Sequence, residues 1–139
     1  MHTIIAVARS ADHEFSKQLL NCIDLIKGEG VAGDCHRGVT VKHRSRVAVD
    51  PTQPNLRQVH LIHAELFDEL STFGHTVKPG QLGENITTRG IDLLALPRDT
   101  LLMLGKSAII QLTGLRNPCH QIEDFQTGLL SKVVYKHDD

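Results

Sequence analysis

Short apolar and β-branched runs, separated by glycine and proline, follow one another along this whole sequence. The chain holds 11 glycines and 5 prolines in 139 residues, and residues of these two types end strands and mark turns. Many short strands with frequent turns are typical of a β-barrel-like domain that carries a few short helices. The sequence therefore predicts a mainly β fold of the α+β class. Strands are expected at residues 3–8, 21–27, 57–62, 85–88, 100–104 and 108–113.

Two helices are expected between these strands. Leu66, Phe67 and Leu70 recur at helical spacing, and Gly74 follows them, which predicts a helix over residues 63–72. A shorter helix is expected over residues 121–125. The segment between the first two strands, which carries Ser16 and Lys17, is interpreted as a polar connection.

A strictly alternating stretch over residues 39–49 predicts a further strand with one basic face. Valines dominate one side, and Lys42, Arg44 and Arg46 lie on the other. A basic strand face either binds phosphate oxygens or is simply solvated. The sequence leaves both interpretations open.

Length and charge limit the classes of protein to which this chain can belong. A chain of 139 residues predicts one domain spanning residues 1–139. Its 15 Lys and Arg against 16 Asp and Glu give a net charge of −1, which argues against nucleic-acid and anionic-membrane partners. No segment approaches the roughly 20 apolar residues of a membrane span, and the first apolar run is too short for a signal peptide. We expect a cytoplasmic protein without a membrane or nucleic-acid partner.

Three cysteines, Cys22, Cys35 and Cys119, are odd in number and lack any CxxC pair. This argues against a disulfide framework and against a structural zinc site. Cys119 follows Pro118, lies near Arg116 and precedes the expected short helix, and a helix N-terminus and a cation both favour a thiolate. A buried, inert cysteine is the alternative, and spacing alone does not decide between the two.

Gly28, Gly30 and Gly33 match the GxGxxG pattern of dinucleotide-binding folds. That pattern requires a helix at its third glycine, but a β-branched run follows here, so a Rossmann fold is not expected. We expect instead that Gly33 allows the backbone to approach a ligand that Asp34 and His36 reach.

Five short motifs follow one another along nearly the whole chain. They are GVAGDCH at 30–36, RQVHLI at 57–62, PGQLGENIT at 79–87, GIDL at 90–93 and RNPC at 116–119. In this order they resemble the MOSC domain, a family named for the C-terminal part of molybdenum-cofactor sulfurases, and especially its bacterial stand-alone members. The resemblance implies a MOSC-type β-barrel with a few short helices that binds the molybdenum cofactor in its molybdopterin form.

The resemblance also implies which residues hold that cofactor. Cys119 would be the catalytic residue, as the ligand of the molybdenum or the carrier of a sulfur, and a soft thiolate suits such a metal. Lysine, arginine and backbone N–H groups suit a phosphate tail, whereas Asp and Asn suit the edge of a pterin ring. The cofactor-binding residues implied are Lys17, Gly33, Asp34, His36, Arg57, Gly83, Glu84, Asn85, Thr87, Arg116 and Asn117.

By the same resemblance, the expected activity is the reduction of N-hydroxylated small molecules. An external electron-donor protein is implied, because a domain of this size cannot hold a flavin or haem besides the pterin. One alternative is a non-catalytic carrier of the cofactor or of a Cys119-bound sulfur. Another is a binding module that has lost the cofactor site.

Two departures from the family pattern shape these expectations. The chain ends at Asp139 without the glycine- and valine-rich strands that follow the cysteine region in relatives. This predicts either a truncated chain or an open barrel, whose edge would favour a homodimer. The aminotransferase-like domain of full-length sulfurases has no counterpart here, so cysteine desulfuration by this chain is not expected.

Overall fold

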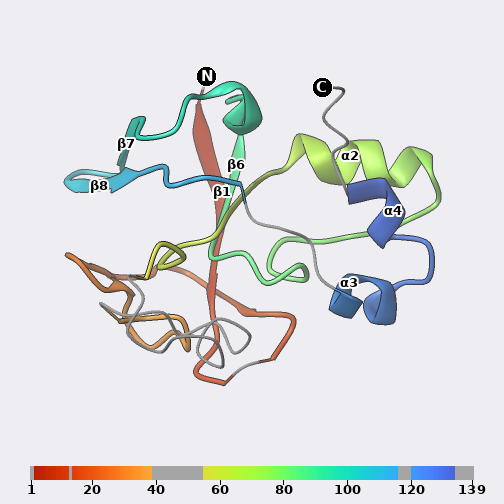
Figure 1. Cartoon of the computed structure of the whole chain (residues 1–139), viewed down its shortest axis with the longest axis horizontal. Helices are drawn as coiled ribbons and strands as arrows, with labels where there is room; N and C mark the ends of the chain where they lie inside the picture. The colour runs from red at the N-terminus through yellow and green to blue at the C-terminus, as the bar shows by residue number, and fades with distance from the viewer. Residues whose placement is uncertain (1, 13, 39–54, 116–119, 134–139) are drawn as a thin grey trace.

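A four-stranded sheet forms the centre of the computed structural model, which describes residues 2–12, 14–38, 55–115 and 120–133. In spatial order the strands are β2 (Gln18–Leu20), β1 (Thr3–Arg9), β6 (Ile86–Arg89) and β5 (Leu61–His63). Figure 1 shows β1 and β6 side by side. β1 is antiparallel to β2 and β6, whereas β5 runs parallel to β6. This pairing brings together three positions that are far apart in the sequence: the end of β1, the start of β5 and the start of β6.

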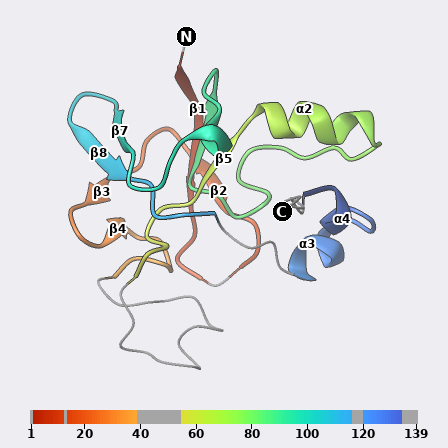
Figure 2. The same cartoon turned by 45° about the horizontal axis from the view of Figure 1, so that its top comes forward.

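Two hairpins lie on the side of this sheet opposite helix α2 (Glu65–Thr72) (Figure 2). One joins β3 (Leu25–Ile26) to β4 (Gly30–Val31), and the other joins β7 (Leu101–Leu104) to β8 (Ala108–Gln111). Gly30 has a φ of +116°, and a Cβ there would lie 2.6 Å from the carbonyl oxygen of Gln58. The close approach of β4 to residue 58 thus requires glycine.

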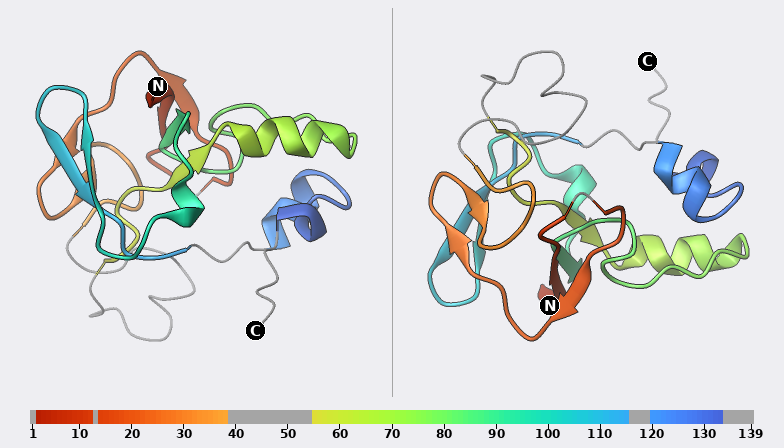
Figure 3. Two further views of the ribbon diagram at one scale, coloured as in Figure 1. Left: turned by 90° about the horizontal axis from the view of Figure 1, so that it is seen from above. Right: turned by 90° about the horizontal axis from the view of Figure 1, so that it is seen from below.

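The helices lie together at the other end of the molecule (Figure 3). They are α2 (Glu65–Thr72), α3 (His120–Phe125) and α4 (Leu130–Val133), and a 3-10 turn, η1 (Leu93–Ala95), precedes β7. Their apolar faces form one buried cluster, which stabilises this end of the fold. Its members are Leu66, Leu70, Val77, Leu82, Ile122, Leu129 and Val133.

Much of the predicted secondary structure is confirmed. The mainly β, α+β class holds, as do the strands near residues 3–8, 85–88, 100–104 and 108–113 and both predicted helices. The sheets of the described residues do not close into a barrel, so the barrel stays a prediction. The predicted basic strand at 39–49 lies outside the described residues.

Two strand predictions were wrong in extent, and one strand was missed. The segment 21–27 is a strand only at Leu25–Ile26, because the chain turns back there through hydrogen bonds from Glu29 N to Ile26 O and from Ala32 N to Asp24 O. Residues 18–20, interpreted as part of a connection, form β2 on β1. The strand predicted at 57–62 begins only at Leu61, since the side chain of Asn85 accepts the hydrogen bond of the His60 backbone N–H.

None of the helices among the described residues has the length and apolar character that crossing a membrane requires.

Candidate functional site

A buried ion pair lies where the chain enters β2 and leaves β4. Lys17 Nζ is 2.6 Å from Asp34 Oδ1, and the two side chains are 2% and 0% exposed. Removing two charges from water costs several kcal/mol for each ion, which only close pairing and further hydrogen bonds offset. The pair therefore depends on the donors around it.

Asp34 accepts hydrogen bonds from several parts of the chain. Its Oδ1 accepts from Ser10 N at 3.0 Å and Asn85 Nδ2 at 3.2 Å, and its Oδ2 accepts from His36 N at 3.1 Å. Burial alone would raise the pKa of Asp34. Hydrogen bonds from His36, Lys17 and Ser10, with the charge of Lys17, instead hold this pKa well below its ordinary value. Asp34 is a carboxylate whose oxygens are engaged within the protein.

His36 connects this buried pair to the surface. Its Nδ1 lies 3.4 Å from Lys17 Nζ and 3.5 Å from Asp34 Oδ2, and its side chain is 17% exposed. The Sγ atom of Cys35 lies 3.4 Å from the same ring nitrogen. Sequence reasoning assigned no role to Cys35, although its place between Asp34 and His36 in the GVAGDCH motif was a usable signal.

The side chains of Asp34, Cys35 and His36 have the atom types of a metal site. One ligand atom from each lies within 4.8 Å of the others. However, a cation between Asp34 Oδ2 and His36 Nδ1 would lie beside the Lys17 ammonium, which is 3.4 Å from that ring nitrogen and 2.6 Å from Asp34 Oδ1, and would be repelled by it. The arrangement thus favours a charge and hydrogen-bond network over a metal centre of these three residues.

Asn85 joins three segments at this network and is almost fully buried. Its Nδ2 donates to Ala8 O at 3.1 Å and to Asp34 Oδ1 at 3.2 Å, and its Oδ1 accepts from His60 N at 3.0 Å. One amide therefore fixes the end of β1, the loop after β4 and the approach to β5 relative to one another.

Asn55 has a similar role on the other side of the loop. Its Nδ2 donates to His36 O at 2.7 Å and to Gly38 O at 2.8 Å, and its Oδ1 accepts from Arg57 N at 3.1 Å. It is buried. Sequence analysis assigned no role to Asn55, and nothing in its neighbourhood in the sequence signals this contact.

Glycines of the turn before β6 position Lys17. A Cβ at Gly80 would lie 2.7 Å from Lys17 O, and one at Gly83 would lie 2.7 Å from Phe15 O. Both residues have a φ above +80°, a conformation that glycine adopts without strain. Lys17 N also donates to Gly80 O at 2.8 Å. The turn and the segment before β2 thus pack backbone to backbone, and this contact holds Lys17 beside Asp34.

Comparison with known proteins identifies the family of this chain. The family description "MOSC domain" matches residues 31–137, which is most of the chain. The chain belongs to the MOSC domain family. Among curated proteins there is no significant match. The crystal structure of the YUAD protein from Bacillus subtilis superposes with a TM-score of 0.75 at 22% identity, over 95% of this chain and 80% of that one. That likeness shows the fold, and the family indicates a role related to the molybdenum cofactor.

The structure brings together four of the predicted site residues of this MOSC domain, namely Lys17, Asp34, His36 and Asn85. Gly33 lies beside Arg9 at the edge of this group. Arg57 is half-buried, and its backbone joins the same loop through Asn55. Three further predicted residues, Arg116, Asn117 and Cys119, lie outside the described residues.

Glu84 and Thr87 form a second buried polar contact in the MOSC domain. The Thr87 hydroxyl donates to Glu84 Oε2 at 3.3 Å, and Glu84 is fully buried. Its Oε1 has no hydrogen-bond partner among the described residues. Burial raises the pKa of Glu84 above its ordinary value of 4.5.

Replacing Glu84 with glutamine should change how stability depends on pH. Because burial raises the pKa of Glu84 in the folded state, ionisation costs stability as the pH rises above 4.5, and glutamine removes that cost. The melting temperature of Glu84→Gln relative to wild type should therefore rise by a few degrees between about pH 4 and pH 8. Thermal unfolding across this range tests the prediction, with Glu69→Gln on the exposed face of α2 as the control. A difference in melting temperature that does not vary with pH would contradict it.

Proposed function

We propose that this MOSC domain binds the molybdopterin form of the molybdenum cofactor beside the Lys17–Asp34 pair and reduces N-hydroxylated small molecules. The observation that carries the proposal is this buried pair in a chain of the MOSC family, held by donors that directly follow β1, directly precede β6 and lie in the loop after β4. Burying two charges in this way costs stability unless every partner is in place. Such an arrangement at a family motif favours a positioning role in a binding site.

The donor set fits a phosphorylated pterin. His36 is partly exposed, and Arg57 is half-buried and is joined to the same loop by its backbone N–H through Asn55. Imidazole and guanidinium N–H groups suit phosphate and pterin oxygens. Lys17 and Asp34 neutralise each other, so their role would be to hold the loop that carries His36. Asn85 would hold Asp34 in turn.

Two sets of predicted residues complete the proposed site. Arg116 and Asn117 would add donors for the phosphate, and Cys119 would supply the thiolate ligand of the metal. When bound, the cofactor supplies a metal that can accept an oxygen atom and electrons. The electrons would come from an external donor protein, and the barrel of the family would enclose the site.

Purification from a host that makes the cofactor tests this function. Wild type and Cys22→Ser, in which the replaced thiol is exposed, should both carry molybdenum and pterin after anaerobic purification. With a reduced viologen as electron donor, both should reduce an aryl amidoxime. Cys119→Ser should keep the pterin, because phosphate and ring contacts do not involve the sulfur, but should lose turnover.

The outcomes separate the alternatives. Wild-type protein with neither molybdenum nor pterin would contradict the proposal. Cofactor without turnover would identify a carrier instead of a reductase. Turnover by Cys119→Ser equal to wild type would show that the sulfur has no catalytic role.

A further inference from the structure

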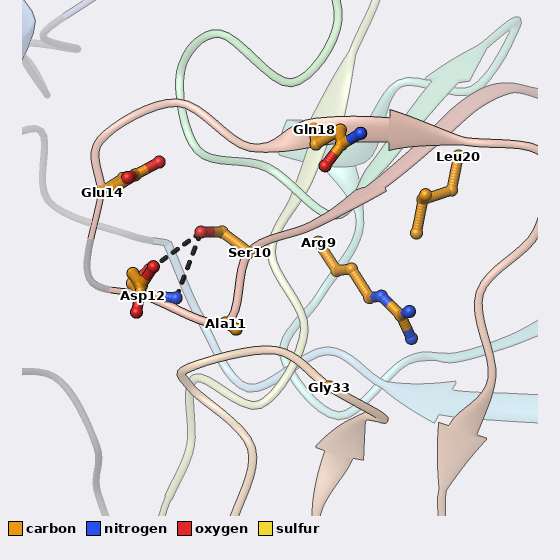
Figure 4. Close-up of a pocket in the computed structure, with 8 residues that line it drawn as sticks. All are labelled: Arg9, Ser10, Ala11, Asp12, Glu14, Gln18, Leu20 and Gly33. Carbon is orange, nitrogen blue, oxygen red and sulfur yellow. Dashed lines mark hydrogen bonds between the residues drawn. The ribbon is translucent and has the colours of Figure 1, made fainter.

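A cavity of about 490 Å³ opens where β1 ends and the chain turns toward β2 (Figure 4). Its lining comes from the end of β1, the loop that follows, β2, and Gly33 of the loop after β4. Cavities of this size bind small molecules. Among the described residues proposed to hold the molybdenum cofactor, only Gly33 lines it, so we treat this cavity as a second site next to the Lys17–Asp34 pair.

Arg9 presents a fixed cation to this cavity. Its Nη1 donates to Ala32 O at 3.0 Å. A Cβ at Gly33 would come within 2.9 Å of Nη1 and 3.2 Å of Cζ of Arg9, so glycine leaves the space in which the guanidinium lies. A guanidinium carries five N–H donors in a planar fork that matches a carboxylate. Since Ala32 takes one, the others can serve a ligand.

Asp12 and Glu14 line the same cavity at its other end, across from Arg9 (Figure 4). Asp12 is held by a local turn, because Ser10 Oγ donates to Asp12 O at 3.0 Å and accepts from Asp12 N at 3.3 Å. No ion pair within the part of the chain that the structure describes joins Arg9 to either carboxylate. Opposite charges therefore border one cavity without neutralising each other.

We propose that this cavity binds a small zwitterion, with its carboxylate on Arg9 and its ammonium or guanidinium group between Asp12 and Glu14. A simple anion would be repelled by the two carboxylates, and a simple cation would be repelled by Arg9. The apolar part of the ligand would pack on Leu20, and the amide of Gln18 would bind its polar atoms. The site would therefore bind a zwitterion in preference to a ligand that carries only one of the two charges.

Calorimetric titration with 4-guanidinobutanoate tests the site, using full-length protein prepared without cofactor. Butanoate and butylguanidinium, each carrying one of the two charges, are the matched controls. The zwitterion should bind at least about tenfold more tightly than either control, which is the effect expected for one charge-assisted hydrogen bond. Arg9→Gln and Glu14→Gln should each weaken zwitterion binding by about tenfold. Lys106→Gln, exposed in the turn between β7 and β8, should leave it unchanged.

Several results would overturn the proposal. They are equal binding of butanoate and the zwitterion, unchanged affinity of both variants, and no binding at millimolar concentrations. Arg9 and Glu14 are exposed, so their replacement should not unfold the protein, and the melting temperature of each variant checks this. Because neither residue belongs to the proposed cofactor site, failure here would leave that proposal untouched.

Discussion

Replacing Asp34 with alanine is expected to lower the free energy of unfolding by about 3–5 kcal/mol. The variant leaves the Lys17 ammonium buried without its partner at 2.6 Å, and it removes the acceptor of Ser10 N, His36 N and Asn85 Nδ2. A domain of this kind has a total stability of roughly 5–15 kcal/mol. Urea unfolding should therefore show a greatly reduced midpoint.

The exposed pair Arg89–Asp68 supplies the matched control. Its atoms are 3.1 Å apart, but the side chains are 47% and 65% exposed, so Asp68→Ala should cost only about 0–1 kcal/mol. Adding Lys17→Met to Asp34→Ala should recover part of the loss, since it removes the unpaired ammonium. If Asp34→Ala cost no more than Asp68→Ala, the structural importance of the buried pair would be contradicted.

The pH dependence of the same variant provides a second measurement. The pKa of Asp34 is lowered from 3.8 by its hydrogen bonds and by Lys17, against the opposing effect of burial. A group with a lowered folded-state pKa contributes its stability above the unfolded-state pKa and loses it as the pH falls. The difference between wild type and Asp34→Ala should therefore be complete at neutral pH and shrink below about pH 4.

Local patterns predicted the parts of this fold that local interactions determine. Leu66, Phe67 and Leu70 recur on one helical face, and α2 forms there. The strand prediction for residues 21–27 was wrong in extent, because the chain turns directly after Ile26, where Glu29 N donates to Ile26 O. β2 was missed because its pairing partner is β1, and a local pattern contains no information about a distant partner.

In the candidate site, too, the sequence predicted the types of the residues but not how they are placed relative to one another. The family resemblance implied Lys17, Asp34, His36 and Asn85 as site residues, whose types suit anions and polar rings. Their contacts, however, join positions 17 and 51 residues apart in the sequence, and only the fold brings these together. Asn55 was missed for this reason, because its function is to satisfy backbone groups of a loop that precedes it in sequence.

Replacing Asn85 with aspartate is expected to have an effect as large as the loss of Asp34. The substitution keeps the shape of the side chain but exchanges Nδ2, a donor, for a carboxylate oxygen 3.2 Å from Asp34 Oδ1 and 3.1 Å from Ala8 O. One buried carboxylate oxygen would then face two acceptors, Ala8 O and Asp34 Oδ1. We expect a loss of about 3–5 kcal/mol at neutral pH, measured by urea unfolding, and about 0–0.5 kcal/mol for Asn21→Asp at an exposed position.

The pH dependence of Asn85→Asp identifies the cause of this loss. Burial and the neighbouring Asp34 would raise the pKa of the new carboxyl in the folded state. Its cost should therefore be small below about pH 4, where an unfolded aspartate is protonated, and should grow as the pH rises. A loss of stability that is as large below about pH 4 as at neutral pH would indicate disturbed packing instead of charge repulsion.

Exchanging the two side chains completes the test. The double variant Asp34→Asn with Asn85→Asp restores one carboxylate and one amide at the site, so the repulsion between two carboxylates no longer exists. If repulsion dominates, the double variant should be more stable than Asn85→Asp alone, with a coupling energy of about 1–3 kcal/mol. Additive losses in the two single variants would contradict this, and would mean that Asn85 acts mainly through Ala8 and His60 and not through Asp34.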